Sequence, residues 1–226
     1  MSSRRPKRSA IAEGALTPDR ALALTHFPAA LRDSVEAIWR IDATFAEIVA
    51  GTTEPHVGAI RLAWWREALE RLDTQDPPAE PRLQAIADHC LPFDLSGATL
   101  AAIEDGYMTL LEEHPDSGRI GRAGAQMFRA IAGLIGHDDA MLDRAGALAM
   151  LARVRGFCSS DVKPAAMDHL QALGGHSFAK PLRPLTLLAR LAARDFLRRE
   201  PEPEGTPGRA FAMLSHRLSG VVTGAR

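Results

Sequence analysis

The sequence predicts an all-α protein of about eight helices. Alternating strand patterns are nearly absent from the 226 residues, and apolar residues instead recur every three or four positions, which is the helical period. Alanine, leucine, arginine and glutamate, which all favour helices, dominate the composition. There is no internal repeat and no coiled-coil heptad pattern, so we expect the helices to pack into one globule.

Proline and glycine breaks divide the first third of the chain into three helices. Thr17 followed by Pro18 is typical of a helix start, because proline suits the first helical position. Pro55 opens a later helix in the same way. The three helices are expected over 18–25, 29–49 and 55–75.

The same signals divide the rest of the chain. Turn-forming residues at 91–94, 114–118 and 136–138 separate helical patterns. Four helices are therefore expected over 81–90, 95–113, 119–135 and 139–155. The chain is then expected to be irregular over 158–175, helical over 182–199, flexible in the linker 201–208, and helical over 209–222.

The bulk properties restrict the class of protein. The chain is long enough for one core and nothing requires a second domain, so we expect a disordered basic tail over 1–15 and one domain over 16–226. A net charge of −1 gives no overall field that would attract nucleic acid. Cys90 and Cys158 fit no CxxC pattern, and neither a membrane span nor a secretory signal is recognisable. These observations predict a cytoplasmic protein, although the basic tail leaves open a weak attraction to anionic lipid.

No common catalytic motif is present: GxxxxGK[ST], HExxH and GxSxG are absent, and the histidines lack ligand spacing. Asp139 and Asp143 share a helix face at i, i+4 and could hold Mg²⁺, but Asp138 and Asp139 follow Gly136 at a helix start, where we favour a role as caps. Asp42 and Glu47 diverge by about 140° around a helix, too far to clamp one ion. Glu104 is expected to be solvated. The sequence therefore predicts no metal site.

A basic stripe lies on the helix expected over 182–199. Arg190, Arg194 and Arg198 recur at i, i+4 and i+8. Such a stripe could bind phosphate, anionic lipid or an acidic partner. A solvated face in an arginine-rich protein explains the stripe more simply, and we favour that interpretation.

The most distinctive segment is the helix around the adjacent tryptophans Trp64 and Trp65. Ile60 and Trp64 fall on one face of this helix, while Leu62 and Trp65 fall on a neighbouring face. Because both faces are apolar, we expect the helix to be packed on more than one side. We therefore expect the tryptophans to belong to the core rather than to a binding site.

Three segments, in this order along the chain, resemble the squalene/phytoene synthase family. The segment AIWRIDATFAEIVAG is similar to the first aspartate-rich helix of the family, RLAWWREAL to the helix that follows it, and AGALAMLARVRG to the helix that carries the second aspartate motif. The resemblance covers roughly Leu16 to Val222. It implies an isoprenoid-synthase-like bundle around a central cavity, with a lining that would include Trp39, Phe45, Trp64 and Trp65.

Active members of this family hold Mg²⁺ between two carboxylate clusters, and the Mg²⁺ binds the substrate diphosphate. At the first cluster, which reads DDxxD in the family, this chain has Ala46, Glu47 and Ala50. At the second cluster it keeps an arginine, Arg155, but has Gly156 and Ser160 at the aspartate positions. An alanine methyl group cannot bind a metal ion. The resemblance therefore implies a degenerate site with no metal, no cofactor and no catalytic residue.

Such degenerate sequences are similar to the branch that includes mitochondrial complex I assembly factors. The resemblance thus implies a binding or assembly role, in the cytoplasm or peripheral at the inner membrane. It implies a protein partner or an isoprenoid or lipid ligand, with peripheral membrane contact and no nucleic acid. Two alternatives stay open: an active Mg²⁺-dependent prenyltransferase that joins prenyl diphosphates, and an isoprenoid carrier.

Overall fold

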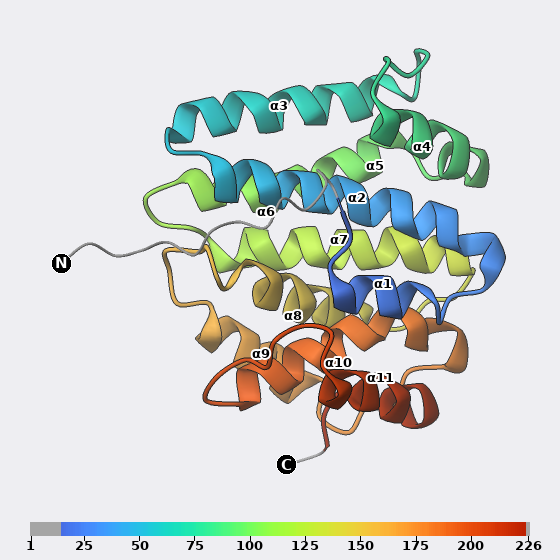
Figure 1. Ribbon diagram of the computed structural model, residues 1–226, viewed down its shortest axis with the longest axis vertical. Coiled ribbons are helices and arrows are strands. Elements are labelled where there is room, and N and C mark those ends of the chain that lie inside the picture. Colours follow the sequence, from blue (N-terminus) through green and yellow to red (C-terminus); the bar gives the residue numbers. More distant parts are fainter. Residues whose placement is uncertain (1–14, 225–226) are drawn as a thin grey trace.

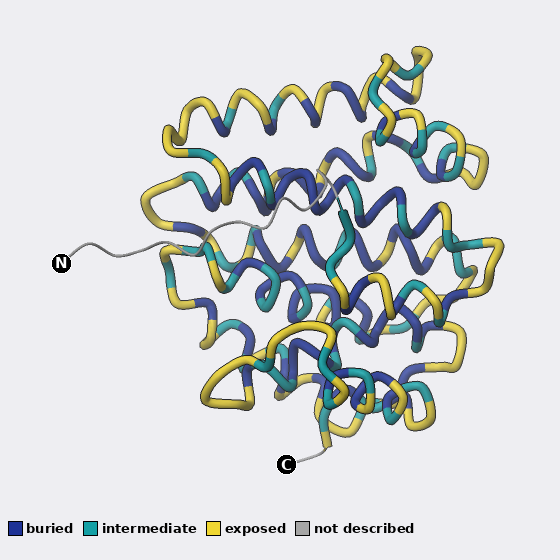
Figure 2. The backbone as a smooth tube through the Cα atoms, in the orientation of Figure 1, coloured by how far each residue is buried: buried dark blue, intermediate teal, exposed yellow. Residues whose placement is uncertain are grey.

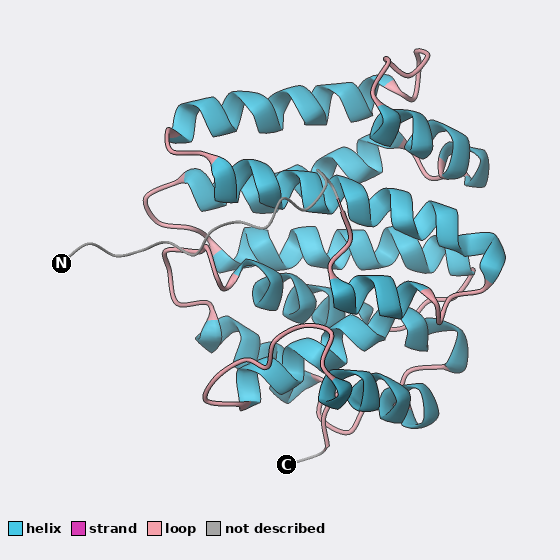
Figure 3. Cartoon of the chain, viewed as in Figure 1, coloured by secondary structure: helices cyan, strands magenta, loops and turns pink. Residues whose placement is uncertain are grey.

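The computed structural model describes residues 15–224, so the tail expected over 1–15 lies almost entirely outside the described residues. The all-α class is confirmed: this part of the chain forms eleven α-helices, four short 3-10 helices and two isolated β-bridges, but no strand (Figure 3). The α-helices are α1 (Pro18–Leu24), α2 (Ala29–Gly51), α3 (Pro55–Arg71), α4 (Pro81–His89), α5 (Gly97–Ala101), α6 (Asp105–Met108), α7 (Ser117–Ile135), α8 (Leu142–Val154), α9 (Lys163–Ala172), α10 (Arg183–Leu197) and α11 (Pro207–Ser219). The 3-10 helices are η1 (Leu91–Phe93), η2 (Ala102–Glu104), η3 (Thr109–Leu111) and η4 (Lys180–Leu182).

The helices stack along the long axis of the molecule (Figure 1). α3 and α4 lie at one end, α9, α10 and α11 lie at the other, and α2 and α7 lie between them. One apolar core runs through the stack, and Trp39, Phe45, Tyr107 and Phe128 are among its largest fully buried side chains. Within residues 15–224, no helix combines the length and the apolar character needed to cross a membrane.

α7 and α8 pack with their backbones in contact. A Cβ atom on Gly124 of α7 would lie 2.3 Å from the carbonyl oxygen of Gly146 in α8, and a Cβ atom on Gly146 would lie 2.4 Å from that of Gly124. Only glycine permits this approach. α7 begins at Asp116, whose carboxylate accepts from the Gly118 N–H at 2.7 Å, and it ends at Gly136 with φ 73°. These contacts fix α8, which carries part of the candidate site.

The expectation of a single helix over 95–113 is wrong. This segment alternates between α5, η2, α6 and η3. Because a 3-10 helix has about three residues per turn, the buried face changes phase at each switch, and a search for one helical period misses the change. The alternation turns Tyr107 and Glu104 inward, at 0% and 3% exposure, so the expectation that Glu104 is solvated is also wrong.

The expectation of an irregular stretch over 158–175 is also wrong, because this segment contains α9. The Asp161 carboxylate accepts from the Lys163 N–H at 2.9 Å, and Pro164 lies in the first turn. Both are ordinary signals of a helix start. With these two corrections, the expected set of helices becomes the observed one.

α3 covers one end of the bundle and buries only one of its faces (Figure 2). Leu62, Trp65 and Leu69 are buried against the core, whereas Ile60 and Trp64 are 67% and 49% exposed. α3 is the outermost helix at its end of the stack (Figure 1). The expectation that this helix is packed on more than one side is therefore wrong.

Candidate functional site

The helices that carry the two candidate motifs, α2 and α8, end on the same side of the bundle (Figure 1). On α2, Ala46 is buried, Glu47 is half-buried and Ala50 is exposed. Just beyond α8, Gly156 is exposed and Ser160 is half-buried. These five positions offer one carboxylate and one hydroxyl group, whereas Mg²⁺ sites take most of their protein ligands from carboxylates. The donor set does not fit a Mg²⁺–diphosphate site.

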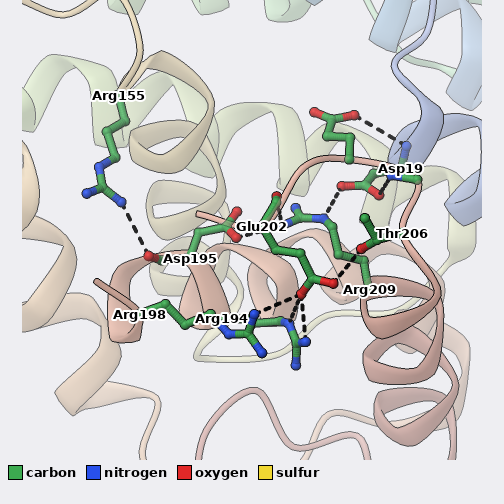
Figure 4. A network of polar contacts seen from close by, with 10 residues as sticks. Asp19, Arg155, Arg194, Asp195, Arg198, Glu202, Thr206 and Arg209 are labelled. Atoms are coloured by element: carbon green, nitrogen blue, oxygen red, sulfur yellow. Dashed lines mark hydrogen bonds and ion pairs between the residues drawn. The ribbon is translucent and has the colours of Figure 1, made fainter. Parts of the chain in front are cut away.

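Arg155, the arginine of the expected second motif, contacts α10 (Figure 4). Its Nη1 donates to the carbonyl oxygen of Asp195 at 3.3 Å. Its guanidinium carbon lies 5.3 Å from the centre of the Phe196 ring, within the range of a cation–π contact. Arg155 therefore holds the end of α8 against α10.

A buried charge cluster lies one turn before the first motif and joins α2 to α8. Asp42 is fully buried, and its Oδ2 lies 2.5 Å from Nη1 of Arg20 and 2.7 Å from Nε of Arg153. The Tyr107 hydroxyl donates to Oδ1 at 2.5 Å. Side chains from α1, α2, α6 and α8 thus meet at one carboxylate, and we call these four residues the Asp42 cluster.

The Asp42 cluster is positively charged, because two guanidinium groups face one carboxylate. Burial alone would raise the pKa of Asp42, but Arg20, Arg153 and the Tyr107 hydroxyl lower that pKa below its ordinary value. Burial and the Asp42 charge raise the pKa of Tyr107, so its hydroxyl keeps its proton. A metal cation placed here would meet two guanidinium groups, which opposes its binding.

A second charge cluster lies where α1, α10 and α11 meet (Figure 4). Nε of Arg209 lies 2.5 Å from Oδ2 of Asp19, and its Nη1 lies 2.5 Å from Oδ1 of Asp195. Asp19 also accepts from the Gly205 N–H at 3.1 Å. Arg209, which lies on α11, therefore ties that helix to α1.

The segment expected to be a flexible linker is anchored by Glu202 (Figure 4). The Glu202 carboxylate lies 2.6 Å from Arg194 and 3.0 Å from Arg198. The third arginine of the stripe, Arg190, donates to the carbonyl oxygen of Val222 at 2.8 Å. The stripe therefore holds the C-terminal segments in place, and the interpretation as a merely solvated face is wrong.

A small polar cavity of about 140 Å³ lies between the two clusters. Arg20 and Arg153 line it from one side, and Asp19, Asp195 and Arg209 from the other. Pockets that hold drug-sized ligands span roughly 300–1,000 Å³. This cavity suits a few water molecules and is too small for a prenyl chain.

The four aromatic residues expected to line a central cavity do not line this one. Trp39 packs edge-on against Phe27 at 5.8 Å between ring centres, and Phe45 packs against Tyr107 at 5.7 Å. Trp64 lies at the surface and packs edge-on against Trp65 at 5.2 Å. These aromatic rings therefore serve packing in α2 and α3.

The carboxylates at the start of α8 are also engaged. Asp139 accepts from the Met141 N–H at 2.8 Å and lies 2.9 Å from the His176 ring, so it stabilises the turn before α8, whose N-cap residue is Met141. Asp143 pairs with Arg129. Among residues 15–224, no three His, Cys, Asp or Glu side chains are grouped so that they could hold a metal ion.

Sequence reasoning missed the Asp42 cluster, although a signal for it exists. Asp42 stands between Ile41 and Phe45 on the strongly apolar part of α2, where a carboxylate needs a buried partner. The spacing of Asp42 and Glu47 excludes a shared ion site but does not indicate the partners of Asp42. The hydrogen-bond partner is Tyr107, the one tyrosine in the sequence.

The comparisons with known proteins give one match. A model of the squalene/phytoene synthase family matches residues 16–120, a stretch that includes α1 to α6 and ends in the first turn of α7. The matched stretch contains Asp42, the first motif and the tryptophan helix, whereas α8 and the second motif lie outside it. No curated protein and no solved structure matches the chain significantly.

Proposed function

We propose that the chain, whose residues 16–120 match the model of the squalene/phytoene synthase family, keeps the family's helical scaffold and works as a non-catalytic binding or assembly protein. The observation that carries this proposal is the ion pair between Asp42 and Arg153, at 2.7 Å. It joins α2 and α8, the helices that hold opposed acidic clusters in active members.

The chemistry of the site supports this proposal. Release of a diphosphate needs Mg²⁺ to neutralise the leaving group, and carboxylates must hold that Mg²⁺. Here Ala46 and Ala50 present methyl groups, and the buried carboxylate of α2 is engaged by two guanidinium groups. The remaining carboxylate at the first motif, Glu47, cannot replace two clusters. The chain's own residues therefore offer a stabilised interior rather than a reaction centre.

The size of the cavity between the two charge clusters argues against an isoprenoid held at the expected site. A bound prenyl chain would need an apolar tunnel, whereas the cavity between α1, α8 and α10 measures about 140 Å³, and charged side chains such as Arg20, Arg153 and Asp195 line it beside apolar ones. A scaffold needs no such tunnel. A protein partner, as for the assembly factors of the family, is the partner that we propose.

The first test measures turnover. We expect the purified chain with Mg²⁺ to release no pyrophosphate from farnesyl or geranylgeranyl diphosphate above the rate without protein. Mg²⁺-dependent release that disappears in the Glu47→Ala variant would overturn the proposal in favour of a prenyltransferase. Isoprenoid extracted from the purified chain, without pyrophosphate release, would favour the carrier instead.

The second test is genetic complementation in the native cell. Deletion of the gene is expected to impair the assembly of a protein complex, and the Glu47→Ala variant is expected to restore assembly fully. The Gly124→Leu variant, which forces α7 away from α8, serves as the control that should fail. Failure of Glu47→Ala to complement, when the variant folds normally, would contradict a non-catalytic role.

A further inference from the structure

α11 turns an apolar face toward solvent. Phe211, Leu214 and Leu218 recur at i, i+3 and i+7, so they lie on one side of the helix. They are 73%, 54% and 77% exposed, and Leu218 and Phe211 are the most exposed large apolar side chains among residues 15–224. A contiguous apolar row of this kind on a water-facing helix marks an interaction surface. We call it the α11 row.

Two segments beside the α11 row lack acidic residues. None occurs between Asp168 and Asp195, and none occurs after Glu204. The fold brings these two stretches together, because the Phe178 N–H donates to the carbonyl oxygen of Gly220 at 3.0 Å. The C-terminal end of α11 is therefore flanked by segments with only basic or neutral side chains, whereas Asp19 and Glu202 lie near its N-terminal end and are paired with arginines.

Three cations, on Lys180, Arg183 and Arg217, gather at the C-terminal end of α11. Nη1 of Arg183 donates to the carbonyl oxygens of Arg217 and Leu218 at 3.0 and 2.7 Å, and Nη1 of Arg217 lies 3.5 Å from the carbonyl oxygen of Lys180. Arg183 thus caps the last carbonyl groups of α11, but carbonyl oxygens do not carry a full negative charge. In the described part of the chain, no ion pair includes any of the three cations.

Burial, and then the positive charges at this end of α11, lower the pKa values of neighbouring groups. Burial is the largest cause that lowers the pKa of Arg217, and the charge of Arg183 lowers it further. Burial and then the charge of Arg217 lower the pKa of His26, which follows α1. No acidic side chain offsets either effect. The charge beside the α11 row is therefore uncompensated within the described residues.

α3 provides a contrast at the opposite end of the molecule (Figure 1). Ile60 and Trp64 are also exposed there. The charges around them are of both signs, however, and several are paired, as in the ion pair between Arg71 and Glu67 at 3.1 Å. The α11 row thus differs from the exposed face of α3 by its one-sided charge.

We propose that the α11 row, together with Lys180, Arg183 and Arg217, docks on an anionic phospholipid membrane. The apolar side chains enter the boundary between headgroups and acyl chains, and the cations pair with headgroup phosphates. Apolar contact alone would suit a second copy or a protein partner equally well. The uncompensated positive charge selects an anionic surface, and this docking is independent of whether the interior catalyses a reaction.

The test is cosedimentation of the full chain with vesicles. One set contains phosphatidylcholine alone, and the other contains phosphatidylcholine and phosphatidylglycerol in equal parts. We expect binding at least about tenfold stronger to the anionic vesicles, with a decrease at high salt. The Phe211→Ser/Leu218→Ser and Lys180→Gln/Arg217→Gln variants should each weaken this binding by about tenfold or more.

Two matched variants keep the test specific. Ile60→Ser/Trp64→Ser alters the exposed face of α3 and should leave vesicle binding unchanged. Replacement of the basic residues of the N-terminal tail, Arg4, Arg5, Lys7 and Arg8, by glutamine should leave most of the binding intact.

Several outcomes would overturn the proposal. They are equal or absent binding to both vesicle types, full binding by the α11 variants, and loss of binding only in the tail variant. Analytical ultracentrifugation without lipid gives the last outcome: a dimer that dissociates in Phe211→Ser/Leu218→Ser would assign the α11 row to a second copy instead.

Discussion

Nε of Arg153 in α8 lies 2.7 Å from the buried carboxylate of Asp42 in α2. This pair places a guanidinium group between α2 and α8. Asp42 also pairs with Arg20 of α1 and accepts a hydrogen bond from Tyr107 of α6. The charged side chains at the centre of the bundle thus pair with one another. A Mg²⁺-dependent reaction centre would instead need carboxylates that are available to bind the metal ion.

Replacement of Asp42 by asparagine should destabilise the fold severely. The change leaves the guanidinium groups of Arg20 and Arg153 buried without their counter-charge, which costs about 3–5 kcal/mol. Urea unfolding at neutral pH measures the loss. The control Glu67→Gln removes an exposed i, i+4 pair with Arg71 and should cost less than about 0.5 kcal/mol. Equal effects of the two changes would contradict the importance of the Asp42 cluster.

The same substitution should have opposite effects at two glycines of α7. Gly124→Ala would place a Cβ atom 2.3 Å from the carbonyl oxygen of Gly146, so α7 and α8 must separate, and we expect a loss of about 2 kcal/mol or more. Gly133→Ala meets no atom within 4 Å and should stabilise the helix by about 0.5–1 kcal/mol. Thermal unfolding of both variants checks the sign, and a stabilised Gly124→Ala would contradict the backbone contact.

The adjacent tryptophans should differ in their contribution to stability. Trp65 is 7% exposed and lies under the Arg82 guanidinium at 4.7 Å, so Trp65→Ala should cost about 3–5 kcal/mol. Trp64 is 49% exposed, and Trp64→Ala should cost about 1 kcal/mol or less. Urea midpoints of the two variants decide the matter. A large loss from Trp64→Ala alone would contradict the assignment of its face to solvent.

Acidification should weaken the attachment of α11 through His216. Burial, followed by the charges of nearby arginines, lowers the pKa of His216 to about 4, although the imidazole keeps a hydrogen bond to the carbonyl oxygen of Val221. The unfolded chain takes up this proton near about pH 6.5, so stability is complete above that pH and is lost as the pH falls toward about 4.

The pH dependence can be separated from that of other groups by a variant. His216→Gln retains polar contact with Thr186 but cannot titrate. The free energy of unfolding, measured at several pH values across this window, should therefore fall more steeply for the native chain than for His216→Gln. Parallel curves would show that His216 does not titrate on unfolding.

The sequence predicts the long helices well because each has an amphipathic pattern over many residues. α2, α7 and α10 lie within a few residues of their expected bounds, since Gly136 and the prolines provide clear ends. The segment from α5 to η3 was mispredicted because its short turns change helical type within three to five residues. Local periodicity carries no information about such changes.

The contacts inside the candidate site are harder to predict from the sequence than the helices are. Arg20 and Tyr107 are 22 and 65 positions from Asp42, so nothing local indicates that they meet. The comparison with the family's first aspartate motif, by contrast, needs only the residue type at each position. Ala46 and Ala50 can therefore be recognised from the sequence alone. The sequence could thus reveal which donors are missing from the first motif, whereas only the fold reveals what fills the centre of the bundle.

The most direct measurement is calorimetric titration of a non-hydrolysable prenyl thiodiphosphate into the purified chain, with Mg²⁺ and without it. Because the first motif keeps only Glu47 and the buried Asp42 is held by two guanidinium groups, we expect no heat that depends on Mg²⁺. Binding that requires Mg²⁺ and disappears in Glu47→Ala would contradict the central claim, because it would mean that the diphosphate site survives.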